Sequence, residues 1–544
     1  MEMINLSIPA TNRFASGYLQ QNPEIMDFFD YRYGDIDQDK ERLKELQNRI
    51  FPREVLADHI KTFMKRYPTS LKVQESLEKL KNPKSTVVIG GQQAGILTGP
   101  LYSIHKVISI IKLAEKKEKE LNIPVVPVFW IAGEDHDYHE VNHVYVPSEQ
   151  KLLKKVYPEK MHQKKMVSDI SLDHKICEQW AFEVMENLGE TEKTQEMKAF
   201  LQKAIEESNH FVDFFAYIIM ELFKDKGLLL VDSGNKDLRN IEKEFFIKQI
   251  ENHGAISNAL DQQQQIIKGH GYPLTIDASL HSANLFYYEK NYSERLLLEF
   301  SKEKNSFISK NKAVSFSEAE LLNLANEYPE RLSNNVVTRP LMQELLFPTI
   351  AFIAGPGEIA YWAELKKVFE IFAIKMPPIV PRLNFTFLER AVERDIEDLG
   401  LSVEEVLRNG TSSAVSKFFS SVKDSELEEQ FLRIKEQVSG QYQIIEKKLT
   451  NLDQGLLPLL SKNEAKLLEQ IDFMKSKIEQ SIQQKHENTF QKFNRIENFL
   501  RPNGGPQERT WNVFYFLNKY GFSIIHEMMN VPLVFDGYHK VIKI

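Results

Sequence analysis

Apolar and polar residues follow one another along the first 390 residues in the order that is typical of a parallel β-sheet covered by helices. A short apolar run at 86–89 precedes an amphipathic segment at 103–120, and a second apolar run follows at 125–132. A strand, a helix and a strand in this order predict a βαβ unit with parallel strands. Further apolar runs of strand length lie at 227–232 and 349–353. The pattern therefore predicts an α/β fold with a Rossmann-like parallel sheet.

Two segments with different patterns of apolar and polar residues interrupt this core, and we interpret them as insertions. The segment at about 150–225 is predicted to be mostly helical, whereas the segment at about 240–335 contains short apolar runs between Gly, Pro and Asn, which predict β-hairpins. Beyond the core, residues 391–500 are highly charged, with apolar positions at intervals of three and four. Gly455 and Pro458 break that pattern near its middle. We therefore expect an α-helical domain with an antiparallel coiled-coil hairpin.

A glycine-rich turn follows the first predicted strand and is the strongest candidate for a ligand site. Glycines let the backbone approach a ligand closely, and the N-terminus of the following helix favours an anion. His105 and Lys106, in the first turns of that helix, are candidate catalytic residues because they can meet charge that develops on a phosphate. The alternative is a tight turn with a solvated lysine. The candidate phosphate-binding residues of the turn are Gly91, Gln92, Gln93, Gly95, Thr98 and Gly99.

The spacing of these glycines matches neither of the two common nucleotide-binding loops. Gly99 is followed by Pro100 where a Walker A loop has Lys and then Ser or Thr, and the three-glycine spacing of dinucleotide-binding folds is missing. A histidine-bearing helix after the first strand is instead similar to the adenylate-forming Rossmann-like class of class I aminoacyl-tRNA synthetases and nucleotidylyltransferases. This similarity implies that the turn binds ATP.

The second predicted strand ends in an unusually ionisable segment, which runs from residue 133 to residue 140. Its carboxylates can hold magnesium or a substrate ammonium group, and its first histidine can position an acyl acceptor or transfer a proton. The candidates are Asp135, His136 and Asp137 for catalysis, and Glu134 and His139 for substrate binding.

Three histidines in and after this segment, His136, His139 and His143, raise zinc as an alternative. Only His139 and His143 have the spacing of four residues that is typical of a helical zinc pair. A solvated charged loop is the other alternative. We expect no tightly bound metal and interpret the segment as part of a site for ATP and substrate.

Later turns contain further candidates. Asp232 ends a predicted strand and can bind ribose or a substrate amine, or it caps the next helix. Arg339 can clamp a carboxylate or a phosphate, or it is an exposed surface arginine. Glu358 follows the strand at 349–353 and is either a ligand-binding residue or an acid that suits the start of a helix. The candidates are Asp232, Arg339 and Tyr361 for substrate, and Gly355, Gly357, Glu358 and Arg382 for nucleotide.

The final segment, 501–544, begins with a turn rich in Gly and Pro and is expected to pack back on the core. Its arginines, paired glycines and aromatic residue suit a second nucleotide or anion site. A purely structural turn is the alternative. The candidate residues of this second site are Arg501, Asn503, Arg509, Trp511 and Asn512.

Composition and charge narrow the range of functions. The 544 residues have a net charge of −8, so we expect no general attraction to nucleic acid. No apolar run is as long as a membrane span, and the N-terminus has no basic segment followed by an apolar one, so we expect a cytoplasmic protein that does not bind membranes. Cys177 is the only cysteine, which excludes an intrachain disulfide, and its apolar neighbours predict a structural role.

Three long motifs in the same order resemble the bacillithiol biosynthesis cysteine-adding enzyme family, and the resemblance extends along nearly the whole chain. The motifs are GGQQAGILTGPLYSIHK at 90–106, VPVFWIAGEDHDYHEVNHV at 126–144 and RPLMQELLFPTIAFIAGPGEIAYWAEL at 339–365. The resemblance implies a ligase that joins cysteine to glucosaminyl malate and so completes the thiol bacillithiol.

We expect ATP, with magnesium, as the activating substrate. The resemblance also implies a homodimer formed through the coiled coil, and a self-contained arm of one monomer is the alternative. We expect the carboxyl group of cysteine to be activated as an adenylate, and an acyl phosphate with release of ADP is the alternative route. A nucleotide-binding regulatory or scaffold protein, dimerised through its coiled coil, is the alternative function.

Overall fold

The computed structural model describes residues 1–148, 151–159, 164–277, 279–289 and 294–544. The chain divides into two compact units, one formed by residues 1–387 together with 505–544 and the other by residues 388–504. The final segment thus belongs to the first unit although it follows the second in sequence.

A five-stranded parallel sheet forms the centre of the first unit. Its strands lie in the order β13-β12-β2-β3-β6, and every neighbouring pair is parallel. The predicted Rossmann-like sheet is therefore confirmed, and the strand order reverses direction between β2 and β12. The strands are β2 (Thr86–Gln92), β3 (Val125–Ile131), β6 (Leu229–Asp232), β12 (Thr349–Ala354) and β13 (Ile379–Pro381).

Helices cover this sheet because its strands are mostly apolar and are buried on both faces. All seven residues of β3 are buried. The amphipathic helix α6 (Tyr102–Leu121) packs along β2 and β3 and ends at Asn122, which adopts the left-handed conformation. Near the start of the chain, α4 (Arg53–Met64) and α5 (Leu71–Lys81) pack against β6 and β3.

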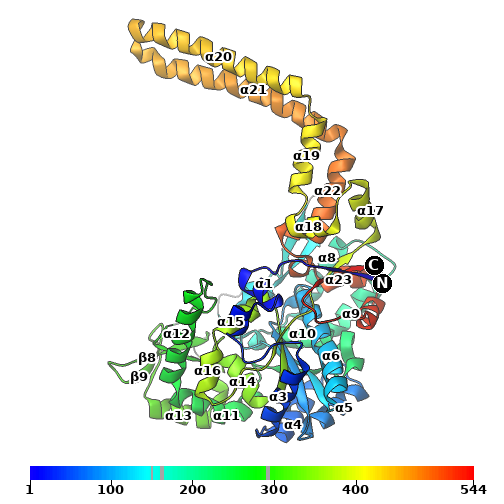
Figure 1. Ribbon diagram of the computed structural model, residues 1–544, viewed down its shortest axis with the longest axis vertical. Helices are drawn as coiled ribbons and strands as arrows, with labels where there is room; N and C mark the ends of the chain where they lie inside the picture. Colours follow the sequence, from blue (N-terminus) through cyan, green and yellow to red (C-terminus); the bar gives the residue numbers. More distant parts are fainter. Residues whose placement is uncertain (149–150, 160–163, 278, 290–293) are drawn as a thin grey trace. The chain divides into compact units, whose positions relative to one another are not determined.

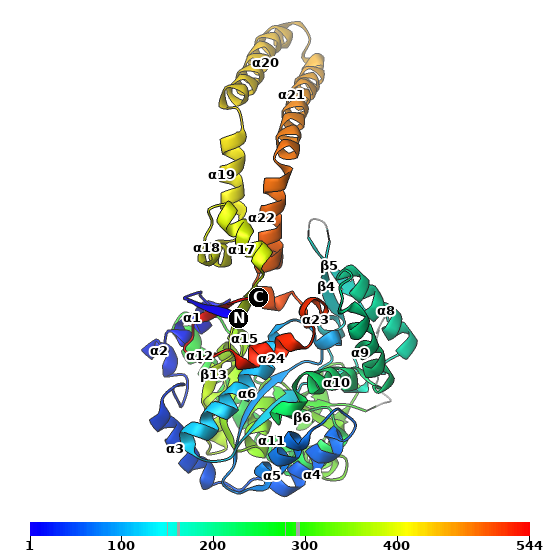
Figure 2. The ribbon, with the colours of Figure 1, turned by 90° about the vertical axis from the view of Figure 1, so that its right-hand side faces the viewer.

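The two predicted insertions have mixed structures. The first starts with a hairpin of β4 (His143–Pro147) and β5 (Leu152–Val156) and becomes helical at α8 (His174–Asn187), α9 (Thr194–Glu206) and α10 (Phe211–Phe223) (Figure 2). The expectation of mostly helical structure therefore holds from α8 to α10, and β5 at the start of the segment is the exception. Cys177 in α8 is buried, and burial raises the pKa of its thiol to about 12, so the thiol is protonated at neutral pH.

The second insertion starts with two helices, α11 (Lys236–Glu251) and α12 (His253–Gly269). An antiparallel sheet in the order β10-β9-β8-β7-β11 follows, so the β-hairpins that the sequence predicts are present. Its strands are β7 (Ser282–Tyr287), β8 (Leu296–Ser301), β9 (Ser306–Ser309), β10 (Ser315–Phe316) and β11 (Leu332–Asn334). From there α14 (Thr338–Leu346) leads into β12, and α15 (Pro356–Ala363) leaves it.

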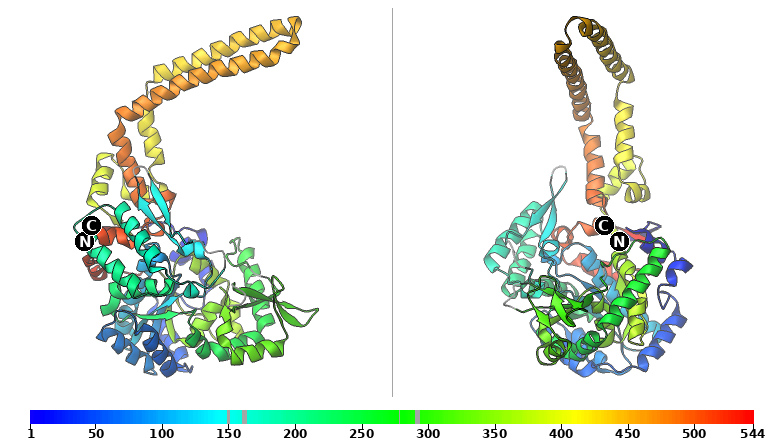
Figure 3. Two further views of the ribbon diagram at one scale, coloured as in Figure 1. Left: turned by 180° about the vertical axis from the view of Figure 1, so that it is seen from behind. Right: turned by 90° about the vertical axis from the view of Figure 1, so that its left-hand side faces the viewer.

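The two ends of the chain lie side by side in the first unit (Figures 1 and 3). There β15 (His539–Lys543) pairs antiparallel with β1 (Glu2–Leu6) and also joins β14 (Phe385–Leu388). Two short helices, α23 (Val513–Tyr520) and α24 (Ser523–Asn530), precede β15.

The second unit is helical and contains the predicted coiled-coil hairpin. Its long helices α20 (Ser425–Leu452) and α21 (Leu457–Lys485) run antiparallel, with Pro458 in the first turn of α21 (Figure 1). None of the residues of either helix is buried. The other helices are α17 (Arg390–Asp398), α18 (Val403–Asn409), α19 (Ser412–Val422) and α22 (Glu487–Leu500). In the described parts of the chain, no helix is long and apolar enough to cross a membrane.

Candidate functional site

A cavity of about 290 Å³ opens beyond the carboxyl ends of β2 and β12. This is the point where the strand order reverses, and open parallel sheets bind their ligands there. The sequence-predicted residues that line the cavity are Gly91, Gln92, Gln93, Lys106, Asp135, Arg339, Gly355, Gly357, Glu358, Tyr361, Arg382 and Arg509.

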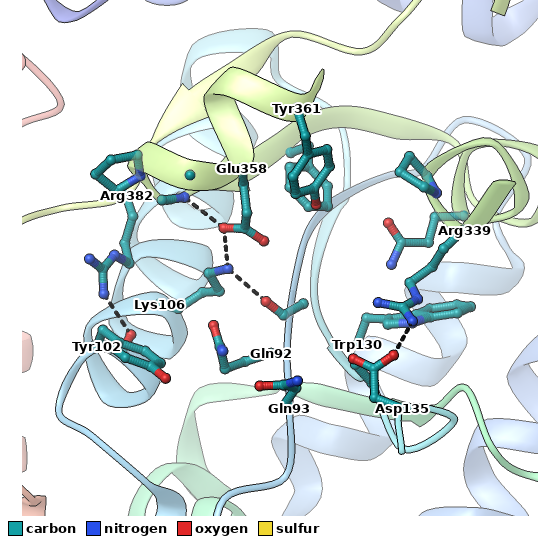
Figure 4. Close-up of a pocket in the computed structure, with 18 of the residues that line it drawn as sticks. Gln92, Gln93, Tyr102, Lys106, Trp130, Asp135, Arg339, Glu358, Tyr361 and Arg382 are labelled. Atoms are coloured by element: carbon teal, nitrogen blue, oxygen red, sulfur yellow. Dashed lines mark hydrogen bonds and ion pairs between the residues drawn. The ribbon is translucent and has the colours of Figure 1, made fainter. Parts of the chain in front are cut away.

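Figure 4 shows that charged side chains occupy two sides of this cavity. Lys106, Glu358 and Arg382 lie on one side, and Arg339 and Asp135 lie on the other. With Arg509, the described lining therefore contains four cationic side chains and two carboxylates. The cavity thus favours a ligand that bears negative charge.

Lys106 is held at the cavity wall by two hydrogen bonds. Its Nζ donates to the carbonyl oxygen of Gly91 at 2.6 Å and to Glu358 Oε2 at 2.5 Å. Burial lowers the pKa of the ammonium, and the Glu358 carboxylate opposes that shift. Gly91 lies near the end of β2, and Glu358 lies in the first turn of α15, which follows β12. The position of this charge is therefore set by the ends of β2 and β12.

The turn after β12 holds Glu358 in place. Gly355 is the N-cap of α15, Pro356 occupies its first turn, and Glu358 is its third residue. The backbone N–H of Gly355 donates to Glu358 Oε2 at 2.6 Å, which is the arrangement of a capping box. The two interpretations of Glu358 therefore coexist: it caps the start of the helix and also faces the cavity.

Arg382 reaches the cavity from the loop after β13. Its guanidinium donates to the carbonyl oxygen of Tyr102 at 3.0 Å, to Asn384 Oδ1 at 3.1 Å and to Glu508 Oε1 at 2.5 Å. Arg509, the residue next to Glu508, also lines the cavity. Among the described residues, no carboxylate lies within salt-bridge distance of Arg509, so this guanidinium is free to bind an anionic ligand.

His105 does not face the cavity, and the expectation that it meets the ligand directly is corrected. Its ring is fully buried, its Nδ1 lies 2.9 Å from Glu508 Oε2, and its ring centre lies 3.5 Å from that of Phe385. On α6, residues 105 and 106 point about 100° apart, so only Lys106 can point toward the cavity.

On the other side of the cavity, Glu134 lies at the centre of a buried group of arginines. Its carboxylate accepts hydrogen bonds from Arg339 Nε at 2.6 Å and from Arg239 Nη2 at 2.8 Å, and Arg295 lies 3.8 Å away. Burial raises the pKa of Glu134, but the three guanidinium groups outweigh it and bring the pKa to about 2. Glu134 therefore holds arginines in place rather than facing a substrate.

Arg339 and Asp135 present this group of arginines to the cavity. The second guanidinium nitrogen of Arg339 donates to Asp135 Oδ1, and both residues line the cavity. Arg339 lies within α14 with its side chain 19% exposed, so the interpretation of an exposed surface arginine is wrong.

The rest of the acidic segment lies outside the cavity. His136 packs its ring against Phe286, with ring centres 5.8 Å apart, and burial lowers the pKa of its imidazole. Asp137 and His139 are exposed around the short helix α7 (Tyr138–Val141). Within the described ranges, no group of three His, Cys, Asp or Glu side chains is arranged to hold a metal ion, so the zinc alternative finds no support there.

The second half of the glycine-rich turn is also outside the cavity. Gly95, Thr98 and Gly99 surround a short helical turn that Asn512 covers, because its side-chain amide donates to the carbonyl oxygens of Leu97 at 2.8 Å and Gly99 at 2.6 Å. The backbone there binds the final segment of the chain. Only the first half of the turn can therefore contact a ligand in the cavity.

The residues of the expected second nucleotide site have different surroundings in the structure. Arg501 donates to the carbonyl oxygens of Leu407 and Gly504 within the helical unit, where Asn503 also belongs. Trp511 is buried, and its carbonyl oxygen accepts the N–H of Leu101 at 2.8 Å. The structure thus divides these residues between the two units, and Arg509 alone reaches the main cavity.

Asp232 is buried at the end of β6 and does not line the cavity. Its carboxylate accepts hydrogen bonds from Ser168 Oγ at 2.9 Å and from the N–H of Gly234 at 2.9 Å. Burial raises its pKa to about 6. The next helix is capped by Asn235 instead, so the capping interpretation of Asp232 is wrong as well.

The sequence analysis did not predict several residues of the site. Tyr102, Trp130 and Gln343 line the cavity, while Glu508 and Arg295 hold its charged residues from behind. Glu508 lies next to Arg509, which the sequence did single out. Its burial depends on contacts across about 400 residues, which no local pattern can indicate.

The comparisons with known proteins cover the whole chain. The family model for "Bacillithiol biosynthesis BshC, N-terminal Rossmann-like domain" matches residues 1–383, and that for "Bacillithiol biosynthesis BshC, C-terminal coiled-coil domain" matches residues 385–544. A relative from Geobacillus sp. (strain WCH70) is 42% identical over 544 residues, and one from Bacillus licheniformis is 38% identical over 544 residues, with 100% of each chain covered. Both relatives bear the name "Putative cysteine ligase BshC".

Proposed function

Because the chain belongs to the bacillithiol biosynthesis BshC family, we propose that it is a ligase that joins the carboxyl group of cysteine to the amine of glucosaminyl malate. The product of this step is bacillithiol. The observation that carries the proposal is the cavity between β2 and β12, where Lys106, Arg382 and Arg509 gather positive charge beside the end of the sheet. Such an arrangement suits a reaction in which negative charge develops on a phosphate.

ATP supplies the activation in this proposal. A carboxylate oxygen of cysteine attacks the α-phosphorus of ATP, pyrophosphate leaves, and a cysteinyl adenylate forms. The amine of glucosaminyl malate then attacks the acyl carbon, AMP leaves, and the amine gives up a proton. Lys106 and Arg382 stabilise the charge on the α-phosphate in the first step and on the departing AMP in the second.

Asp135 and Arg339 suit the recognition of the amino acid. A carboxylate next to the reacting centre can bind the ammonium group of cysteine, and the guanidinium of Arg339 holds the Asp135 side chain in place. The buried Glu134 in turn fixes Arg339. This side of the cavity therefore offers a rigid binding place for a zwitterion.

Magnesium enters with ATP in this proposal. Asp135 and Glu358, the two carboxylates of the described lining, are each engaged with a cation of the protein. Mg²⁺ commonly keeps several waters and binds through substrate phosphates with few protein ligands, which fits a site without a carboxylate cage. In this proposal the cationic side chains of the lining bind the phosphates of ATP, and the phosphates hold the magnesium ion.

We also propose that the protein is a homodimer joined through α20 and α21. Apolar side chains along both helices are exposed, among them Ile434 and Ile445 on one face of α20 and Leu467 and Met474 on one face of α21. A two-helix hairpin that leaves such a seam open to water gains stability when a second copy covers it.

One incubation tests the proposed reaction. The purified protein is mixed with cysteine, magnesium ATP and glucosaminyl malate, and the products are identified by mass spectrometry. The proposal expects a new amide that depends on all three substrates, with one nucleotide consumed per amide. If no amide forms while the protein binds ATP, the proposed ligase function is wrong and a nucleotide-binding regulatory protein takes its place.

A further inference from the structure

Glu508 is a buried carboxylate that connects the final segment of the chain to the wall of the cavity. It lies in a short 3₁₀ turn, Gln507–Arg509, and is itself 7% exposed. One carboxylate oxygen accepts from Arg382 Nη2 at 2.5 Å, and the other lies 2.9 Å from His105 Nδ1. Both oxygens are thus occupied by side chains that come from distant parts of the sequence.

Glu508 is ionised at neutral pH. Burial raises the pKa of its carboxyl group, but Arg382 and the hydrogen bond from His105 outweigh that effect and bring the pKa to about 2. A buried carboxylate with an arginine partner forms a charge-assisted hydrogen bond, which is about twice as strong as a neutral one. Glu508 can therefore fix the direction in which the Arg382 guanidinium points.

His105 contacts the carboxylate oxygen of Glu508 that Arg382 leaves free. Burial lowers the pKa of the imidazole to about 4, so the ring is neutral at physiological pH. A carboxylate can only accept, so the single ring proton lies on Nδ1 and points at Glu508. His105 thus acts on Glu508 as a fixed donor and does not add a charge of its own.

Two guanidinium groups meet at one aromatic ring on the rim of the cavity. The central carbon of Arg382 lies 5.8 Å from the centre of the Tyr102 ring, and that of Arg509 lies 6.0 Å from it. Arg382 has Glu508 as its partner, whereas no carboxylate among the described residues pairs with Arg509. Arg509 is therefore a positive charge on the rim that no described carboxylate neutralises.

We propose that Glu508 is a positioning residue that holds the Arg382 guanidinium beside Arg509, so that the two groups form a subsite for an anionic group of a substrate. The anion is a phosphate of ATP or a carboxylate of the malyl group, since both present two oxygens to a guanidinium. The assignment of these substrates rests on the proposed function. The subsite itself rests on the positions of Glu508, Arg382 and Arg509.

Calorimetric titration of the full-length protein with magnesium ATP, and separately with glucosaminyl malate, tests the subsite. In Glu508→Gln, Arg382 loses its charged partner, and we expect binding of the substrate that uses the subsite to weaken about tenfold or more. Weaker ATP binding identifies a phosphate, and weaker binding of glucosaminyl malate identifies a carboxylate. Unchanged affinity for both overturns the proposal.

Asp39→Asn is the matched control for a merely structural effect. Asp39 is a buried carboxylate paired with Lys117, and neither residue lines the cavity. This variant is expected to lose stability while both affinities remain at the wild-type value. If it weakens the same substrate as much as Glu508→Gln does, Glu508 has no positioning role.

A double-mutant comparison links Glu508 to Arg382. If Glu508 acts through Arg382, then Glu508→Gln causes little further loss of affinity in a protein that already contains Arg382→Lys. Fully additive losses overturn the proposal. These titrations need no turnover, so a wild-type protein that binds both substrates but forms no amide would refute the proposed function and leave the subsite intact.

Discussion

Lys106 Nζ lies 2.5 Å from Glu358 Oε2 although 252 residues separate them in the sequence. This ion pair joins α6, which follows β2, to α15, which follows β12. The same ammonium also binds the carbonyl oxygen of Gly91. Lys106 therefore connects the end of β2 to the start of α15 at the point where the strand order reverses. The charge of Lys106 is thus held in advance of substrate binding.

Replacement of Lys106 by methionine should abolish most of the activity and leave the protein folded. The variant keeps the length of the side chain but removes the charge that faces the phosphate, so we expect kcat/KM to fall by about 10²–10³-fold. Glu358 still caps α15 in this variant, because its carboxylate keeps the N–H of Gly355 as a donor. Steady-state kinetics, together with circular dichroism, provide the measurement.

Lys116→Met serves as the control for Lys106→Met. Lys116 lies on the same helix, has its side chain 40% exposed and does not line the cavity. Its replacement should leave kcat/KM within about twofold of the wild type, since surface changes away from the site have small effects. Equal activity losses in the two variants would mean that a general perturbation of α6, and not the loss of the Lys106 charge, lowers the activity.

The parallel sheet could be predicted from the sequence because apolar runs and turns are local signals. The charged segment after β3 shows what local signals cannot predict, namely which of its side chains face the cavity. Glu134 and Asp135 are neighbours in sequence, yet one binds three arginines in the interior and the other faces the cavity. The arginine partners lie in α11, just before β8 and in α14, so their arrangement depends on how distant elements pack.

The same limit applies to the glycine-rich turn. Its glycines predicted a close backbone approach correctly, but the approaching group for Gly99 is Asn512 of the chain itself. A pattern of glycines indicates that something comes near and does not indicate what. For the same reason His105 and Lys106 looked equivalent in the sequence, although one is buried against Glu508 and the other lines the cavity.

Removal of the Glu134 charge should destabilise the protein strongly. Glu134→Gln leaves Arg239, Arg295 and Arg339 without their shared carboxylate in a buried place, and breaking such a pair costs about 3–5 kcal/mol. Urea denaturation at pH 7 measures the free energy of unfolding. A loss below about 1 kcal/mol would show that the arginines do not depend on Glu134.

Acid should unfold the protein over a defined range of pH. Glu134 and Glu508 have folded-state pKa values of about 2, below the ordinary value of 4.5, so their ionised forms stabilise the folded state above pH 4.5. That stability is lost as the pH falls from 4.5 towards 2, at up to about 1.4 kcal/mol per pH unit for each group. Urea denaturation series at several pH values should show this slope, and Glu134→Gln should reduce it. Identical slopes in the two proteins would contradict the assignment.

Removal of the coiled-coil hairpin should leave a monomer. Phe418 of α19 and Phe490 of α22 pack with ring centres 5.5 Å apart, so a short Gly-Ser linker can replace residues 425–485 between these helices. All residues that line the cavity lie in the other unit, and ATP binding should persist. Light scattering measures the mass of the shortened protein in solution. A dimer of this variant would place the interface elsewhere on the chain.

The fate of oxygen from the carboxyl group of cysteine tests the central claim most directly, because an adenylate and an acyl phosphate deliver that oxygen to different products. Cysteine labelled with ¹⁸O in its carboxyl group is incubated with the protein, magnesium ATP and glucosaminyl malate, and the products are analysed by mass spectrometry. Adenylate formation at the cavity between β2 and β12 predicts one ¹⁸O atom in AMP for each amide formed. The label in inorganic phosphate, with ADP as the nucleotide product, would contradict it.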